Sequence, residues 1–312
     1  MGSLVPGMRP CEAGGNRGNL MTKPEQEAFE ERLSRQIAAY HDAALLYAAV
    51  KLGLPDRLAA QANTPEQLAE AMDLSAPHLH RFLRGLTVIG ICEEHPDKTF
   101  VLTPAGQALR SGSRLAEKVQ IVVGQYWRPW SELVSCLQTG KPSFEHVYGM
   151  DVWDWRRSNA EQGALFDSYL SKETLDQSDA IAEALDLSEV KTVANIAGDN
   201  LRAIPAEADL YVLNGVLQNW DDAEVSAILT NCRKVMPPSA KLLVVERLLP
   251  ERASDDAAAI MLDLHMMVIT GGRVRSLAEI EALLSQAGLA LSKVSSTTAG
   301  QSILVAEGKN EP

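Results

Sequence analysis

Few residues of this chain combine the type and the setting needed for acid–base chemistry. Glu246 ends an apolar segment, residues 241–246, that has the composition of a buried strand. A carboxyl group at a strand end can give or take a proton, although the same acid could serve only to hold the neighbouring loop. His265 lies beside Met266 in a methionine-rich helical pattern, which is more typical of packing than of ligand binding. Glu246 is therefore the best single candidate for a catalytic group.

The cysteines do not suggest a metal site or a disulfide framework. The four are Cys11, Cys92, Cys136 and Cys232. None of them forms a CxxC pair, and no histidine–cysteine cluster has zinc-ligand spacing. We interpret them as reduced thiols of a cytoplasmic protein and predict no bound metal.

The charge balance argues against two classes of partner. The 312 residues contain 29 Lys plus Arg against 41 Asp plus Glu, a formal charge of −12, and such a protein is repelled by nucleic acid. No apolar run approaches the ~20 residues that span a bilayer, so no membrane association is expected. Residues 1–21 are rich in glycine and contain no signal-peptide core. We predict that they form a disordered leader.

The N-terminal third shows the order of a winged helix. Residues 43–54 carry one charge, Lys51, so this helical stretch is buried in a core or in a subunit interface. Residues 64–67 form a capping box that opens a helix, a second helix covers 78–89, and a hairpin follows at 91–102. Helix, helix and hairpin in this order predict a winged-helix fold.

A winged helix usually suggests DNA binding, but the charges oppose this function. Residues 40–110 contain more acids than bases, whereas a DNA-reading domain carries a clear basic excess. Arg81 and Arg84 on the second helix are better explained as a solvated face.

Aromatic residues gather in the helical stretch 113–187. Trp127 and Trp130 belong to this group, together with several tyrosines and two further tryptophans. Aromatics at this density usually form core, but some can line a pocket for a flat, apolar ligand. With His265 and Met266 they are our candidates for a substrate pocket.

The last third alternates strands and helices. Strands are expected at 208–217 and 241–246, helices at 222–235, 257–269 and 277–287, and a closing strand pair at 289–306. This is half of a doubly wound α/β domain. We therefore predict an α/β chain with a winged-helix domain over residues 22–112 and a truncated Rossmann-like domain, preceded by connecting helices, over 113–312.

Several motifs together resemble the dimeric O-methyltransferases of small molecules, the family of acetylserotonin, caffeate-type and bacterial polyketide methyltransferases. The likeness covers residues 26–307 and rests on Ala-Asp-Leu-Tyr at 208–211, Val-Leu-Gln-Asn-Trp-Asp-Asp at 216–222, Leu-Val-Val-Glu-Arg at 243–247, Asp-Leu-His-Met at 263–266 and Gly-Gly-Arg at 271–273. The resemblance implies a dimerisation domain, a Rossmann-like domain that binds S-adenosylmethionine (SAM), and a substrate pocket between them.

The chain departs from the family at the cofactor loop. The family has a glycine-rich loop after its first Rossmann strand and an acid for the ribose further on. Here Asn195 stands at the first acid of that motif, and the chain passes directly to residues that resemble a much later segment. Roughly 50 residues, about two βα units, are missing by this comparison. Asp199 and Trp220 match cofactor-contact positions of the family, but without the loop they read more simply as a surface acid and a packed indole.

The catalytic positions also differ. The family base is a histidine, and Gln218 occupies its position here. An amide cannot take a proton from a phenol, because it has no basic lone pair. Of the two acids that flank that histidine in the family, Glu246 remains and Val274 replaces the other. Glu246 and Gln218 are thus the candidate catalytic residues.

Three functions stay open on this basis. The first is an enzyme that needs no SAM and performs a cyclisation, rearrangement, elimination or decarboxylation on an aromatic or polyketide-like substrate. The second is a non-catalytic subunit in a heterodimer with an active relative. The third is a conventional SAM-dependent O-methyltransferase. We favour the first, which predicts no cofactor, and expect a dimer formed by the N-terminal half.

Overall fold

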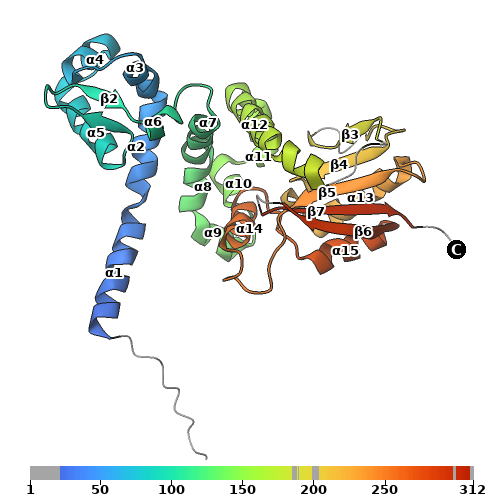
Figure 1. Ribbon diagram of the computed structural model, residues 1–312. Helices are drawn as coiled ribbons and strands as arrows, with labels where there is room; N and C mark the ends of the chain where they lie inside the picture. The colour runs from blue at the N-terminus through green and yellow to red at the C-terminus, as the bar shows by residue number, and fades with distance from the viewer. Residues whose placement is uncertain (1–21, 185–187, 189, 199–203, 298–299, 310–312) are drawn as a thin grey trace, which may run out of the picture.

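The computed structural model describes residues 22–184, 188, 190–198, 204–297 and 300–309. The predicted leader at residues 1–21 lies outside the described residues. Figure 1 shows a small N-terminal domain at one end, a group of helices in the middle and a β-sheet with its helices at the other end. The expected fold class, an N-terminal helical domain followed by a Rossmann-like domain, is confirmed. The exact domain boundaries stay predictions.

The N-terminal region is a small helical domain with a two-stranded hairpin. Its helices are α1 (Lys23–Ala38), α2 (Tyr40–Lys51), α3 (Leu54–Ala60), α4 (Pro65–Met72), α5 (Ala76–Val88) and α6 (Pro104–Gln107), and its strands are β1 (Cys92–Glu94) and β2 (Phe100–Leu102). Thr64 and Gln67 form the predicted capping box at the start of α4, each side chain accepting the backbone N–H of the other residue. The order matches the predicted winged helix.

The apolar stretch at 43–54 is divided between two helices. Gly53 adopts a left-handed conformation with φ of 63°, and this turn separates α2 from α3. Ala49 and Leu54 are fully buried and pack in one core with Leu83 and Phe100. The stretch therefore contributes to the core of its own domain.

Helices fill the middle of the chain. They are α7 (Arg114–Ile121), the π-helical turn η1 (Val122–Tyr126), α8 (Trp127–Ser131), α9 (Leu133–Thr139), α10 (Ser143–Tyr148), α11 (Val152–Ser158) and α12 (Ala160–Ala184). Ser113 and Asp151 cap α7 and α11 through their side chains. Phe144 and Val152 pack with Val268 and Ile269 from the C-terminal part, so these helices are joined to the sheet domain by an apolar cluster.

The C-terminal domain is built on a mixed sheet. Its strands are β3 (Val193–Asn195), β4 (Leu210–Asn214), β5 (Lys241–Glu246), β6 (Leu289–Ser296) and β7 (Ser302–Gly308). The order among the described residues is β3-β4-β5-β7-β6, with β3, β4 and β5 parallel and β7 antiparallel to both of its neighbours. Its helices are the short η3 (Leu217–Asn219), α13 (Asp222–Val235), α14 (Ala257–Ile269) and α15 (Leu277–Gln286).

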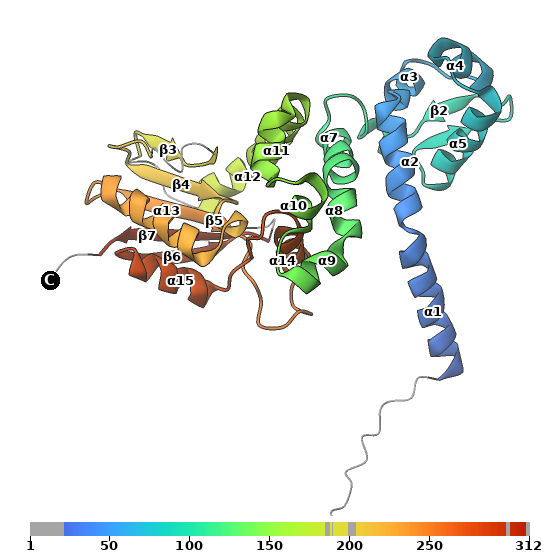
Figure 2. The same ribbon diagram turned by 180° about the vertical axis from the view of Figure 1, so that it is seen from behind.

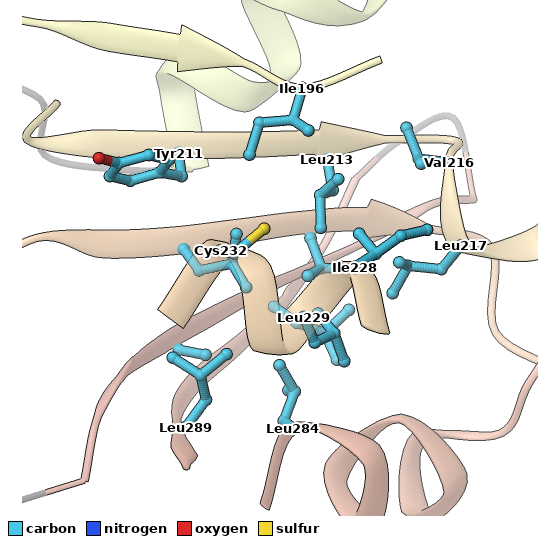
Figure 3. Packing of buried hydrophobic residues seen from close by; sticks show 14 of the residues in the cluster. Ile196, Tyr211, Leu213, Val216, Leu217, Ile228, Leu229, Cys232, Leu284 and Leu289 are labelled. Carbon is cyan, nitrogen blue, oxygen red and sulfur yellow. The ribbon is translucent and has the colours of Figure 1, made fainter. Parts of the chain in front are cut away.

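The two faces of the sheet carry alternate residues of each strand. Tyr211 and Leu213 of β4 point to one face, where α13 and α15 cover them, while Leu210 packs on the other. Figure 3 shows Ile228, Leu229 and other side chains of α13 directed at the strands. This packing fixes the carboxyl ends of β4 and β5 next to each other.

The parallel strands β3 and β4 are joined by residues 196–209 only. A whole βαβ unit, strands included, takes about 30 residues, so this connection has no room for two further βα units. β3 has β4 as its one described neighbour, and Val193 on β3 is 59% exposed. Within the described residues, β3 therefore forms an edge of the sheet.

Candidate functional site

One large cavity lies where the sheet meets the middle helices. Its volume is about 2980 Å³, well above the roughly 300–1,000 Å³ of common ligand pockets. Residues that follow β3, β4 and β5 line one side, and aromatic residues of η1, α8, α11 and α14 line the other. Ligands of doubly wound α/β folds bind at the carboxyl ends of parallel strands, so this cavity is the candidate site.

A tight turn after β4 carries Gln218 into the cavity wall. Gly215 turns the chain with φ of 63°, and η3 follows directly. Asn219 donates from Nδ2 to the carbonyl of Gly215 over 2.8 Å, which closes the turn on itself. The Gln218 side chain has no hydrogen-bond partner among the described residues and lines the cavity. Its amide is thus available to a ligand as both donor and acceptor.

Glu246 holds this turn from the neighbouring strand. It is 3% exposed, and its Oε1 accepts the backbone N–H of Leu217 over 2.8 Å. Burial raises the pKa of its carboxyl to about 7, although the amides of the turn oppose this shift. Glu246 and Gln218 both line the cavity, and the backbone N–H that Glu246 accepts belongs to the residue next to Gln218.

Arg275 fixes the other end of the turn. Its guanidinium donates to the carbonyls of Leu217 and Trp220 and to the carboxylate of Asp222, each over 2.8 Å. Gly272 lies against the same backbone, where an added Cβ would come within 2.2 Å of the Gln218 carbonyl oxygen. Glu246, Arg275 and Gly272 therefore restrain the backbone of the turn that carries Gln218.

Val274 is buried at the position of the second family acid. It is 1% exposed, and its backbone N–H donates to Asp263 over 2.8 Å. A carboxylate is thus present near this position, but it belongs to α14 and is engaged with the backbone.

Trp220 joins the sheet domain to the middle helices. Its indole lies 6.1 Å from that of Trp153, centroid to centroid, with the planes 21° apart. Trp220 lines the cavity as well. Asp199, the other predicted remnant of the cofactor site, lies outside the described residues.

His265 faces the cavity from α14. Trp130 donates its indole N–H to Nδ1 of His265 over 3.2 Å, and Tyr126 meets the imidazole edge-on at 4.6 Å. Burial lowers the pKa of His265 to about 4, and the nearby charge of Arg156 adds to this shift. The imidazole is therefore neutral at physiological pH.

The predicted substrate-pocket residues are only partly brought together. Trp130, His265 and Met266 line the cavity. Trp127 is not among the lining residues, because its ring meets Tyr40 of α2 edge-on at 6.4 Å. The prediction for Trp127 is corrected in this respect: its ring packs against Tyr40 of α2 and so faces the N-terminal domain.

Sequence reasoning missed Arg156. This residue of α11 is 7% exposed, lines the cavity and bonds to Gln125 and Tyr126. The available signal was its spacing: Arg156 follows Val152 by four residues and so shares the buried face of the helix, whereas Arg157 does not.

Among the described residues, no group of three His, Cys, Asp or Glu side chains could hold a metal ion. The described helices include none long and apolar enough to cross a membrane.

Comparison with known proteins identifies the family. Residues 35–112 match the O-methyltransferase dimerisation domain, and residues 172–290 match the O-methyltransferase domain. The chain belongs to the O-methyltransferase family. Phenazine O-methyltransferase PhzM of Lysobacter antibioticus is 29% identical over 324 residues, covering 88% of this chain and 95% of the relative.

Solved structures of O-methyltransferases share the fold. The structure of LaPhzM aligns with a TM-score of 0.85 at 28% identity, covering 90% of this chain and 99% of that one. CalO1, a methyltransferase of calicheamicin biosynthesis solved with S-adenosylhomocysteine (SAH) bound, aligns with a TM-score of 0.71 at 29% identity, covering 92% and 99%.

The prediction that no cofactor is needed is contradicted by these relatives. It rested on the missing glycine loop, but CalO1 was solved with SAH bound, and the matched domain is that of O-methyltransferases. In this chain the ends of the parallel strands β3, β4 and β5 open on the cavity.

Proposed function

We propose that this protein is a SAM-dependent O-methyltransferase that acts on a hydroxyl group of an aromatic small molecule of secondary metabolism. The observation that carries this proposal is the single cavity that joins the ends of β3, β4 and β5 to an aromatic wall. Such a cavity offers one side to a cofactor and the other to a flat substrate. The named activity of the phenazine O-methyltransferase relative supports the same reaction.

The side chains at the strand ends are of types that can bind SAM. Asn195 and Asn214 supply amide groups and Trp220 an indole face, all on the cavity wall. In this chain the contacts with SAM would fall to these side chains. When bound, SAM supplies a methyl group activated by its sulfonium.

We further propose that the segment between β3 and β4 is shorter than in the relatives. The match with the phenazine enzyme runs over 324 residues but uses 88% of the 312 residues, so roughly 50 positions of the match have no counterpart here, about two βα units. The short connection at 196–209 is the place in the fold where such units would stand.

The side chains around the turn would handle the acceptor hydroxyl. Gln218 cannot take its proton but can orient the oxygen through its free amide. Glu246 lies beside it with a pKa raised to about 7, which suits a group that accepts a proton near neutral pH. Trp130, His265 and Met266 would hold the ring of the substrate and exclude water.

A direct test uses the purified protein with SAM, SAH and a panel of hydroxylated naphthoic acids and phenazines. We expect saturable SAH binding by calorimetry and transfer of a radiolabelled methyl group from SAM to at least one compound. If neither SAM nor SAH binds, the proposal fails. If both bind and no compound is methylated while a partner methyltransferase is activated, the non-catalytic subunit becomes the correct function.

We propose that two copies of this chain associate through their N-terminal domains. Figures 1 and 2 show α1 standing clear of the rest of the described chain, yet it carries Phe29, Leu33 and Ile37 at helical spacing with exposures of 38%, 40% and 77%. The match to the dimerisation domain supports the same association. Obligate interfaces bury about 2,000 Å² or more. Light scattering of Ile37→Glu should show a shift toward monomer, and a monomeric wild type would refute the dimer.

A further inference from the structure

Arg156 is a buried cation whose protein partners are all neutral. Its Nε donates to Oε1 of Gln125 over 3.2 Å and its Nη2 to the hydroxyl of Tyr126 over 2.8 Å. The ring of Phe166 lies 3.3 Å from the guanidinium carbon, measured to the ring centroid. Among the described residues, no carboxylate comes within ion-pair distance of Arg156. Asp167, an exposed neighbour, acts on it only through longer-range attraction.

Burying the charged guanidinium of Arg156 carries a desolvation cost in free energy. An ionised group that leaves water needs a counter-charge or a full set of hydrogen bonds, and an arginine cannot escape by losing its proton. The bonds of Arg156 use Nε and Nη2, which leaves Nη1 without a partner in the described part of the chain. Because Arg156 also lines the cavity, Nη1 is available to an acceptor on a ligand.

Two neighbouring side chains offer further donors. The hydroxyl of Tyr126 accepts from Arg156, so its own hydrogen remains to be donated, and burial raises its pKa, which keeps it protonated. An indole N–H can only donate; Nδ1 of His265 must therefore accept from Trp130, and the proton of the neutral imidazole sits on Nε2. We refer to Arg156, Tyr126 and His265 as the donor cluster; all three line the cavity.

We propose that the donor cluster binds the carboxylate of an aromatic acid, so that the substrate of this protein carries a carboxyl group beside the ring that is methylated. A carboxylate is planar, accepts several hydrogen bonds and neutralises a guanidinium. Trp130, Trp153 and Phe166 lie next to the cluster and line the same cavity, where they can contact the aromatic ring. This inference rests on the proposed function, since it names the class of substrate that the same site takes.

The carboxylate of SAM itself is the other chemical source of such a group. The two sources are separable, because a substrate carboxylate leaves the binding of SAH independent of Arg156. The aromatic surroundings of the cluster favour the substrate, since the amino-acid end of SAM is aliphatic and charged and gains little from ring faces.

The test compares 1-hydroxy-2-naphthoate with 1-hydroxy-2-naphthamide by calorimetry in the presence and in the absence of SAH. We expect wild-type protein to bind the acid about tenfold or more tightly than the amide. Arg156→Met should abolish this preference and leave SAH affinity unchanged, and Arg156→Lys should restore part of it. Arg128→Met is the matched control, because Arg128 is an exposed arginine of the same helical region and does not line the cavity. Thermal unfolding confirms that each variant is folded.

Each other outcome is decisive. Equal binding of acid and amide by the wild type, or no binding of the acid, overturns the proposal. Loss of SAH affinity in Arg156→Met with the acid preference retained assigns the cluster to the cofactor and also overturns it. Arg156-dependent binding of the acid by a protein that neither binds SAH nor methylates would support the carboxylate site while the proposed methyltransferase function fails. If Arg156→Met does not fold, comparing the affinities of Arg156→Lys and the wild type for the acid and the amide still tests the proposal.

Discussion

Trp130 donates its indole N–H to Nδ1 of His265 over 3.2 Å, with the two ring planes 18° apart. The two residues are far apart in the sequence and come from α8 and α14. Because Nδ1 accepts this bond, the proton of the neutral imidazole lies on Nε2. His265 can therefore donate a hydrogen bond from Nε2.

We predict that His265 stays neutral from pH 5 to pH 8. Burial lowers its pKa from 6.5 to about 4, so the folded state binds fewer protons than the unfolded state between these values. The stability that His265 contributes is therefore present above pH 6.5 and lost as the pH falls toward about 4. Nitrogen-15 NMR of the imidazoles should show the Nε2–H tautomer in the wild type and mixed tautomers in Trp130→Phe. A His265 signal that titrates near pH 6.5 would contradict the prediction.

We predict that Glu246→Gln lowers methyl transfer by ~10²-fold or more, because the amide cannot accept the proton of the hydroxyl. The wild-type rate should rise with pH through about 7, the raised pKa of Glu246. Glu161→Gln is the control, since Glu161 is exposed and does not line the cavity. Full activity in Glu246→Gln would show that Glu246 only holds the turn.

The same substitution also has a signature in stability. The pKa of Glu246 is raised from 4.5, so its contribution is present below pH 4.5 and lost as the pH rises through about 7. Glutamine does not ionise, so Glu246→Gln removes this loss of stability at higher pH. The stability of the variant relative to wild type should therefore increase from pH 4.5 to pH 8 in urea unfolding, and parallel profiles would refute the raised pKa.

We predict that Arg275→Met destabilises the fold by about 2–3 kcal/mol, because it removes charge-assisted bonds to two carbonyls of the turn and to Asp222. Arg273→Met is the matched control. Its side chain pairs with Asp222 too but is 41% exposed, so its loss should cost about 1 kcal/mol or less. Chemical unfolding measures both, and equal losses would remove the structural role that we assign to Arg275.

We predict that Gly272→Ala is destabilising by about 1–3 kcal/mol. The new Cβ would approach the backbone of Gln218, Asn219 and Trp220 to between 2.2 and 2.7 Å, and backbone atoms of a clamped turn cannot move aside. Gly124→Ala is the control, because its Cβ would meet side-chain atoms no closer than 3.8 Å. If the two variants are equally stable, the turn has more freedom than the structure shows.

The sequence by itself determined most of the secondary structure and indicated the family, although the strand expected at 208–217 ends at Asn214. The capping box at Thr64, the apolar helix at 257–269 and the continuous apolar run at 241–246 are local patterns that can be read directly from the sequence. The place of Glu246 and Gln218 together was also predictable, because the ends of adjacent parallel strands meet at one edge of a sheet.

Only the tertiary structure showed which other residues contact one another in the site. Trp127 and Trp130 are the same residue type on the same helix. Their packing differs, however: one ring contacts Tyr40 and the other contacts His265. The donor cluster joins residues of η1, α11 and α14, and the neutral surroundings of Arg156 are visible only when all three are folded together. Charge pairing and burial depend on which residues are close in space. A sequence pattern shows only which residues are neighbours along one helix or strand, so it does not show these contacts.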